Sequence, residues 1–340
     1  MQDIEVKGLA VAVVKENSVV FCKSYGIKND VENLEEQDLF RIASVSKTFV
    51  ATAILQLMEA GKLDLRDNIN DYLKFNVQNP LYPDSVITLE MLLSHRSSIN
   101  DKKGYDSFSC LEEGSCFENF PPGDKFYYSN MNYCLLAAII ENIVGYRFDY
   151  VIKDSIISPM GLNASFNLKD VDATLLVDTY YYDRVTQQFL KLDNIYHSIV
   201  KDESNYVLGY SVTSLEPAGG LLISSYDLAK YMQMHMNNGI LENGRRVITE
   251  ESENDMRKVR TKEINYGLSF RRYSNLLKNK VLYGQTGGSR GVYSAMIFDP
   301  VEKYGFVILC NGCKTVDRDG YSTLHKRAIN ILYDKVVRNI

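Results

Sequence analysis

Short apolar runs of the kind found in β-strands lie near both ends of the chain. Residues 9–15 and 18–25 flank a turn at Glu16 and Asn17, and this pattern predicts a β-hairpin. Similar runs return in the last hundred residues, separated by polar turns. They predict four further strands, over residues 265–272, 281–285, 292–299 and 305–310.

Longer segments with apolar residues every three to four positions occupy the middle of the chain and predict helices. The most regular one begins at Ser44 and ends just before Gly61, which suits a helix C-cap. Another is expected to stop at Pro159, and the polar, tyrosine-rich residues 163–215 fit no simple pattern. The predicted helices cover residues 44–60, 89–95, 133–144, 146–160, 224–239, 249–259 and an amphipathic segment from Ser322.

Strands at both ends with helices between them predict the α+β class. We expect one antiparallel sheet assembled from both termini and flanked by helices, with a mostly helical region inserted beside it. Residues 1–43 and 240–340 would form the sheet and the C-terminal helix, and residues 44–239 the helical part. A chain of 340 residues suits one large domain or two closely packed ones.

Composition and residue spacing narrow the functional classes. The net charge of −5 gives no reason to expect a nucleic-acid partner, and no apolar run reaches the roughly 20 residues that span a bilayer. The histidines lack metal-ligand spacing, and no glycine pattern for a nucleotide occurs, so we expect neither a metal nor a cofactor. The absence of a Gly-x-Ser-x-Gly motif argues against an α/β-hydrolase.

The cysteines allow two interpretations. Cys110 and Cys116 flank a short polar loop and could form a disulfide in an oxidising compartment. Cys310 and Cys313 form a lone C-x-x-C motif. Because Cys310 ends an apolar strand, a buried thiol is favoured there over a zinc ligand.

Ser44 and Lys47 stand three positions apart at the start of the most regular helix, so they share one face. A serine hydroxyl is a weak nucleophile, but a lysine that is desolvated enough to lose its proton can activate it. The backbone N–H groups at a helix start also favour negative charge near Ser44. Ser198 and Lys201 fit the same spacing, and a bare Ser-x-x-Lys is most often two residues on a helix surface.

Two later motifs contain the partners that a serine nucleophile needs. Tyr128 and Asn130 follow a Pro-Pro-Gly turn; a phenol can relay a proton if the lysine lowers its pKa, and an amide can orient lysine and substrate. The same residues also suit a helix N-cap, and residues 273–275 repeat the pattern. Residues 283–291 place small side chains at the end of a strand, where a substrate could lie as an added strand. A glycine-rich bulge is the alternative there.

In this order, the motifs resemble those of the serine β-lactamase and penicillin-binding protein family, the SxxK acyl-transferases. The resemblance is greatest to the branch of class C β-lactamases, D-alanyl-D-alanine carboxypeptidases and related esterases, in which a tyrosine opens the second motif. It extends over nearly the whole chain. Further similar segments are residues 40–43, 61–65, 92–95, 122–123 and 218–221.

The resemblance implies a serine hydrolase of β-lactamase/transpeptidase-like fold, with its site between the two parts of the molecule. Ser44 would be acylated by a peptide, amide or ester substrate, and Lys47 and Tyr128 would share the acid–base work. The N–H groups of Ser44 and Gly288 would hold the oxyanion. The expected substrate and oxyanion residues are Asn130, Gln285, Thr286, Gly287, Gly288 and Arg290.

One residue departs from the family's pattern. The third motif usually opens with lysine or histidine, whereas here it opens with Gln285, which is uncharged. In the family this corner often helps to bind a substrate carboxylate, and one hypothesis is that Arg290 supplies the missing charge. The substitution also leaves open a catalytically weak or inactive peptidoglycan- or ligand-binding module of the same fold.

The resemblance further implies an extracytoplasmic location, which means periplasmic, secreted or cell-surface. No export signal is visible, and residues 1–4 lead almost at once into a strand, so we expect the signal to be missing from this sequence. A cytoplasmic location stays open. The expected partner is a small-molecule or peptide substrate, and the residues do not indicate an oligomeric state.

Overall fold

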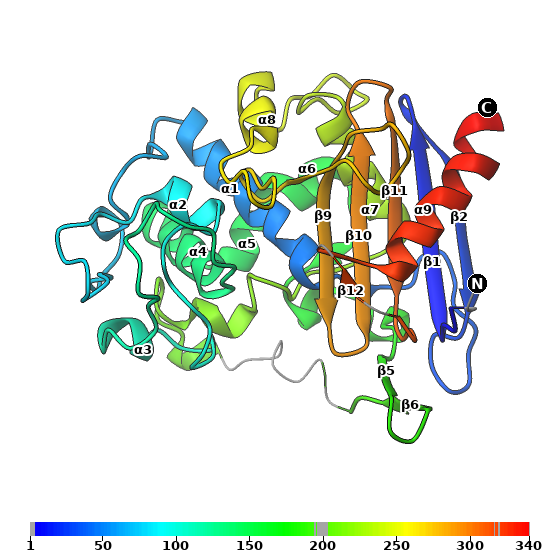
Figure 1. Ribbon diagram of the computed structural model, residues 1–340, viewed down its shortest axis with the longest axis horizontal. Coiled ribbons are helices and arrows are strands. Elements are labelled where there is room, and N and C mark those ends of the chain that lie inside the picture. Colours follow the sequence, from blue (N-terminus) through cyan, green and yellow to red (C-terminus); the bar gives the residue numbers. More distant parts are fainter. Residues whose placement is uncertain (1–3, 194, 196–202, 316, 319, 340) are drawn as a thin grey trace.

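A six-stranded antiparallel sheet forms one side of the molecule and brings the two ends of the chain together (Figure 1). The computed structural model describes residues 4–193, 195, 203–315, 317–318 and 320–339. The strand order is β2-β1-β11-β10-β9-β8, so the N-terminal hairpin lies beside strands from the last part of the chain. These strands are β1 (Gly8–Lys15), β2 (Ser18–Gly26), β8 (Arg271–Tyr273), β9 (Leu282–Ser289), β10 (Val292–Asp299) and β11 (Tyr304–Cys310).

This sheet confirms the predicted α+β class and the antiparallel assembly from both termini. The predicted strand over residues 265–272 is wrong, because only β8 pairs with β9 in that region. Asn265 and Ser269 have φ angles of 55° and 67°. These left-handed conformations turn the chain back on itself instead of extending it.

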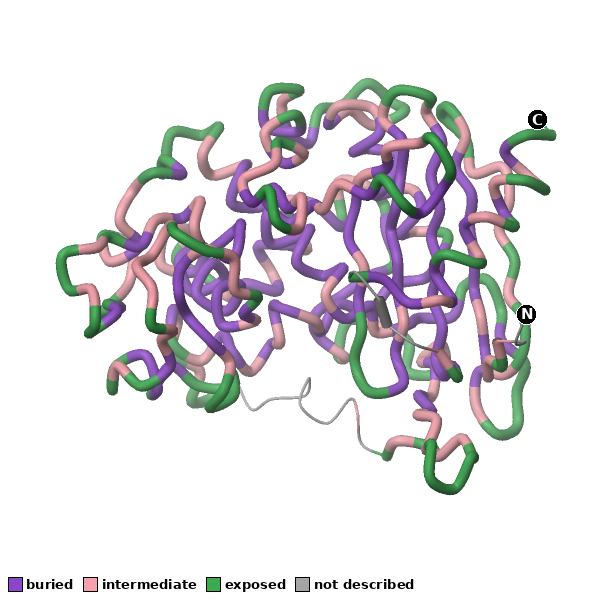
Figure 2. Tube along the Cα trace, in the orientation of Figure 1, coloured by how far each residue is buried: buried purple, intermediate pink, exposed green. Residues whose placement is uncertain are grey.

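Both faces of the sheet are buried, because alternate side chains of β1 enter two different hydrophobic cores. Ala10, Ala12 and Val14 enter the large core shared with the helical part, whereas Val11 and Val13 enter a second core. Helix α7 (Ser225–Met236) packs on the first face, against β1 and β11, and α9 (Thr323–Lys335) covers the second. Figure 2 shows buried residues along the strands and the helices behind them, and exposed residues mainly along the loops.

The helical region lies beside the sheet, with α1 (Lys47–Glu59) and α4 (Met131–Val144) among its most buried elements. The helical segment predicted over residues 146–160 ends as expected: its last element, α6 (Ser158–Met160), finishes one residue beyond Pro159, and Gly161 follows in the left-handed conformation. Pro159 lies in the first turn of α6, which follows directly on a π-helical turn formed by Lys153–Ile157. The remaining helices are α2 (Leu89–Leu93), α3 (Ser109–Glu112), α5 (Phe148–Ile152) and α8 (Glu250–Arg257).

Short strand pairs connect distant loops around the start of α1. β3 (Phe40–Arg41) pairs with β7 (Leu222–Ile223), which also pairs with β4 (Ala164–Ser165). The segment before Ser44 therefore lies beside the segment that follows Glu216. Two further pairs are β5 (Tyr180–Asp183) with β6 (Gln188–Lys191), and β12 (Asp317–Arg318) with β13 (Tyr321–Ser322).

The division into residues 1–43 with 240–340 and residues 44–239 stays a prediction. Helix α7, which it assigns to the helical part, packs on the sheet. Cys110 and Cys116 are free thiols, as are Cys310 and Cys313, so the structure does not contain the disulfide considered for the first pair. Within the described ranges, no helix is long and apolar enough to cross a membrane.

Candidate active site

Ser44 lies in a tight turn, not in the first turn of an α-helix as predicted. Residues Ala43–Ser46 form a 3-10 turn, and α1 begins only at Lys47. Ala43 has a φ of 46°, a strained conformation for a residue with a Cβ, and such strain is often found at functional sites. The turn places the Ser44 hydroxyl 3.1 Å from the Nζ atom of Lys47.

Lys47 is fully buried and makes three hydrogen bonds through Nζ. Besides Ser44, its partners are the Oδ1 atom of Asn130 and the carbonyl oxygen of Ala218, each at 2.7 Å. Burial disfavours the ammonium form and lowers the pKa of Lys47 to about 7. A large share of molecules therefore hold this lysine as a neutral amine at neutral pH.

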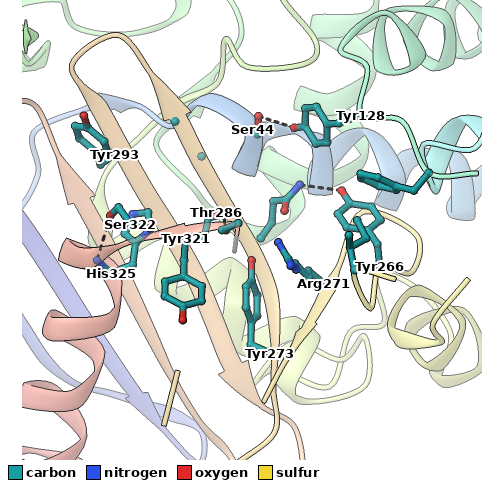
Figure 3. Close-up of a pocket in the computed structure, with 16 residues that line it drawn as sticks. Ser44, Tyr128, Tyr266, Arg271, Tyr273, Thr286, Tyr293, Tyr321, Ser322 and His325 are labelled. Carbon is teal, nitrogen blue, oxygen red and sulfur yellow. Dashed lines mark hydrogen bonds between the residues drawn. The ribbon is translucent and has the colours of Figure 1, made fainter. Parts of the chain in front are cut away.

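The Tyr128 hydroxyl donates a hydrogen bond to the Ser44 hydroxyl across 2.8 Å, as Figure 3 shows. The ring is 37% exposed at the mouth of the site, but it also stacks on buried His95, with the ring centroids 4.1 Å apart. Desolvation raises the pKa of Tyr128. The condition considered from the sequence, a Tyr128 pKa lowered by Lys47, is therefore not met, and the phenol stays protonated at neutral pH.

Asn130 is held by a carboxylate from a preceding loop. Asp101 accepts hydrogen bonds from the backbone and the side-chain amide of Asn130, at 2.7 and 2.9 Å. It also accepts from the Met131 backbone N–H. Asn130 is the N-cap residue of α4, as the N-cap interpretation of residues 128–130 has it, but its side chain makes no capping hydrogen bond. The Asp101 carboxylate accepts from the backbone N–H groups at this helix start instead.

Strand β9 lies directly against the turn that contains Ser44. A Cβ atom added at Gly287 would stand 2.5 Å from the carbonyl oxygen of Ile42 and 2.9 Å from the backbone nitrogen of Ser44. Ser294, opposite Gly287 in the sheet, donates a hydrogen bond to the same Ile42 oxygen. Gly288 faces open space. Residues 285–289 are regular strand, so the bulge interpretation is wrong.

A pocket of about 370 Å³ lies between this strand and Tyr128 (Figure 3). It contains Ser44 and four consecutive residues of the third motif, from Gln285 to Gly288. β8 pairs with β9 only as far as Gly284, and beyond it the outer edge of β9 has no strand partner among the described residues. An extended substrate segment can therefore lie along this edge.

The charge in this pocket comes from a residue that the sequence did not single out. Gln285 is buried, and its amide donates to the hydroxyl of Tyr266 at 2.9 Å. Arg290 is not part of the lining; its guanidinium lies 3.9 Å from the centre of the Tyr181 ring. Arg271 does line the pocket, and the described lining contains no acidic side chain.

The structure brings together Ser44, Lys47, Tyr128 and Asn130, and it places residues 285–288 on the opposite wall. The competing Ser198 and Lys201 lie outside the described residues. Sequence reasoning missed Asp101 and Arg271, because neither stands in a recognisable motif. It singled out residues 218–221 as a family-like segment but gave the Ala218 carbonyl no role. Within the part of the chain that the structure describes, no cluster of histidine, cysteine or carboxylate side chains is arranged to hold a metal ion.

Comparison with known proteins identifies the family. A sequence model of the Beta-lactamase family matches residues 1–329, so the chain belongs to this family. It is 25% identical over 230 residues to penicillin-binding protein 4 of Amycolatopsis lactamdurans, covering 64% of this chain but only 56% of that relative. It is 24% identical over 343 residues to penicillin-binding protein 4* of Bacillus subtilis (strain 168), covering 95% of this chain and 72% of that protein.

Solved structures agree on the fold. The octameric penicillin-binding protein homologue from Pyrococcus abyssi matches with a TM-score of 0.75 at 24% identity, over 97% of this chain and 74% of that chain. The fold is therefore β-lactamase/transpeptidase-like, as the resemblance implied. The protein is a serine hydrolase of the Beta-lactamase family.

Proposed function

We propose that the protein cleaves a peptide or amide through an acyl-enzyme formed on Ser44. The observation that supports this most strongly is the set of hydrogen bonds around Lys47. Two of its three partners, the Asn130 and Ala218 oxygens, can only accept. A neutral amine has two N–H donors and one lone pair. When both donors serve these acceptors, the lone pair is left for the Ser44 hydroxyl.

The reaction follows from this arrangement. Ser44 Oγ attacks the substrate carbonyl carbon while its proton passes to Lys47 Nζ. The carbonyl oxygen becomes an oxyanion, which the backbone N–H groups of Ser44 and Gly288 stabilise. The carbon–nitrogen bond then breaks as the Tyr128 hydroxyl protonates the leaving nitrogen. Tyr128 has then lost its proton, and the Lys47 ammonium restores it. In the second half of the reaction, water takes the place of the leaving group and hydrolyses the acyl-enzyme by the same steps in reverse.

The pocket favours a substrate with a carboxylate close to the scissile bond. Arg271 provides a planar guanidinium that can bind a carboxylate with two hydrogen bonds. Thr286 lies beside it on β9, with its hydroxyl donating to the carbonyl oxygen of Gly320 at 2.7 Å. Arg271 thus takes over the role that the sequence suggested for Arg290. A peptide that ends one residue beyond the scissile bond fits this arrangement.

Labelling and turnover test the proposal together. Intact-protein mass spectrometry after treatment with a fluorophosphonate should show one adduct, and peptide mapping should locate it on Ser44. Hydrolysis of p-nitrophenyl acetate, a chromogenic cephalosporin and a D-alanyl-D-alanine peptide should then rank the substrate classes. Ser44→Ala should abolish every activity that wild type shows.

The alternative is a binding module that keeps the fold without the chemistry, and buried, uncharged Gln285 is the observation that favours it. Folded wild-type protein that takes up no label on Ser44 and hydrolyses none of the three substrates would support this alternative. The names of the relatives, which are penicillin-binding proteins, also support an extracytoplasmic location.

A further inference from the structure

A chain of hydrogen bonds links Lys47 through Asn130 to the carboxylate of Asp101, which has no part in the proposed reaction. Oδ1 of Asp101 accepts from the Ser129 hydroxyl at 2.7 Å and from the Met131 backbone N–H at 3.2 Å. Oδ2 accepts from both the backbone and the side-chain nitrogens of Asn130. Two of these four donors are backbone groups at the start of α4, which a capping residue alone would satisfy. The bond to the Asn130 side chain goes beyond capping.

This extra bond determines which way the Asn130 amide points. A carboxylate can only accept, so the amide NH2 group must face Asp101 and the amide oxygen must face Lys47. The reversed amide would set oxygen against oxygen at Asp101. It would also direct an NH2 donor at Lys47, and the lysine lone pair would accept from that donor.

We propose that Asp101 is a positioning residue of the reaction, which locks the Asn130 amide so that the lone pair of neutral Lys47 stays directed at Ser44 Oγ. The proposal rests on the proposed function, in which Lys47 is the base. Asp101 itself touches neither substrate nor the reacting atoms. It acts through Asn130, and the step it supports is the transfer of the Ser44 proton to Lys47.

Asp101 also contributes the negative charge near the lysine. The groups that face Lys47 are Cys134 and Tyr133 on α4, Tyr128 before that helix, and His95 after α2. Burial raises the pKa of Cys134 and lowers that of His95, so both are neutral at neutral pH. Burial lowers the pKa of Lys47, and the Asp101 carboxylate opposes this shift.

Asp101→Asn tests the proposal, because it keeps the shape and removes the charge and one acceptor. With p-nitrophenyl acetate as substrate, the plateau of kcat/KM should fall about 10–100-fold. The new NH2 group must face either the two Asn130 nitrogens or the Met131 N–H, so a donor–donor contact replaces at least one of the four hydrogen bonds that Asp101 accepts. The acid limb of the pH profile should move to lower pH, because the lysine ammonium loses its nearby anion. A merely structural defect would lower the plateau without moving the limb, and that result would overturn the proposal, as would wild-type kinetics.

Three further comparisons distinguish a positioning role of Asp101 from a purely structural one. Ser129→Ala removes one bond to Asp101 without touching Asn130 and should cost less than about threefold; a loss equal to that of Asp101→Asn would mean that Asp101 only stabilises the start of α4. In an Asn130→Ala background, Asp101→Asn should lose most of its effect on the plateau. Asp124→Asn, on an exposed turn, serves as the matched control and should change nothing.

Two safeguards keep the outcomes separate. If Asp101→Asn does not fold, Asp101→Glu replaces it as the test. Asp101→Glu keeps the negative charge but displaces the carboxylate oxygens, so it should lower the plateau of kcat/KM and leave the acid limb of the pH profile where it is. An undiminished plateau in Asp101→Glu overturns the proposal. Failure of the proposed function would show in a different comparison, that of wild type with Ser44→Ala. If the Ser44→Ala variant kept the wild-type activity, Ser44 would not be the nucleophile.

Discussion

Gln285 donates a hydrogen bond from its side-chain amide to the hydroxyl of Tyr266, across 2.9 Å. The residue that opens the third motif is therefore uncharged and already paired, and it gives the site no second cation. Burial raises the pKa of Tyr128. Tyr128 is therefore protonated in the resting site and donates its hydrogen bond to Ser44.

Tyr128→Phe should therefore affect substrates according to their leaving groups. An amine must be protonated to leave, so hydrolysis of a D-alanyl-D-alanine peptide should fall about 100-fold or more. A nitrophenolate leaves without a proton, so p-nitrophenyl acetate hydrolysis should fall less than about 10-fold. Steady-state kinetics on both substrates checks this, with Tyr127→Phe as the neighbouring control. Equal losses on the two substrates would mean that Tyr128 acts as a base in the attack.

The lowered pKa of Lys47 predicts the pH dependence of acylation. The base must be neutral, so kcat/KM for p-nitrophenyl acetate should rise with pH, pass its midpoint near the Lys47 pKa of about 7, and level off above it. Lys47→Arg should be inactive at every pH, since a guanidinium does not lose its proton. A wild-type profile that keeps rising to about pH 10, where an ordinary lysine titrates, would contradict the assignment.

The same shift should appear in stability. In the unfolded chain Lys47 has an ordinary pKa, so between about pH 7 and 10 the unfolded state binds more protons than the folded state. This residue's contribution to the free energy of unfolding therefore rises with pH across that window and is least favourable below pH 7. Chemical denaturation of wild type and Lys47→Met at several pH values measures it. A difference between the two that stays constant from pH 7 to 10 would refute the shift.

Arg271→Met should separate charged from neutral substrates. We expect KM for a D-alanyl-D-alanine peptide to rise about 10–100-fold, because a charge-assisted hydrogen bond is lost. The same peptide with a C-terminal carboxamide should be hydrolysed as before. Arg290→Ala is the matched control, since that guanidinium lies over Tyr181 and does not line the pocket. If Arg290→Ala selectively impairs the carboxylate peptide and Arg271→Met does not, the earlier sequence hypothesis is the correct one.

Gly287→Ala and Gly288→Ala form a pair that tests the packing of β9 on Ser44. The added Cβ at Gly287 meets backbone atoms at 2.5 and 2.9 Å, so we expect a loss of about 1–3 kcal/mol in stability and a large loss of activity. At Gly288 the Cβ meets nothing within 4 Å, so thermal unfolding should change by less than about 0.5 kcal/mol. Similar unfolding curves for the two variants would contradict this packing.

The sequence predicted the fold and the principal motif residues because both depend on local pattern. The β1–β2 hairpin, the strands β10 and β11 and helix α4 follow directly from apolar periodicity. Ser44, Lys47, Tyr128 and Asn130 were found through short motifs in a fixed order. The start of α1 was misplaced because a 3-10 turn with a strained Ala43 has no periodic signature.

The remaining site residues depend on contacts between distant segments. Arg271 reaches the pocket only because β8 pairs with the first residues of β9, and nothing in its neighbourhood distinguishes it from Arg272 or Arg290. Asp101 meets Asn130 because its loop folds back on the start of α4. The Ala218 carbonyl has no side-chain signal at all. Such residues can be found only once the sheet pairing and the loop paths are known.

The packing of β9 on the Ser44 turn also determines when, during synthesis and folding, the surroundings of Ser44 become complete. Ser44 and Lys47 are synthesised early, whereas Ala218 and Gly287, which complete their surroundings, come much later in the chain. Before those segments dock, Lys47 lacks its burial, keeps the pKa of an ordinary lysine and cannot accept the serine proton. Under the proposed mechanism, a growing or partly unfolded chain therefore has no activated nucleophile at Ser44. The same mechanism predicts that reactivity at Ser44 reports the docking of the segments around Ala218 and Gly287 on the Ser44 turn.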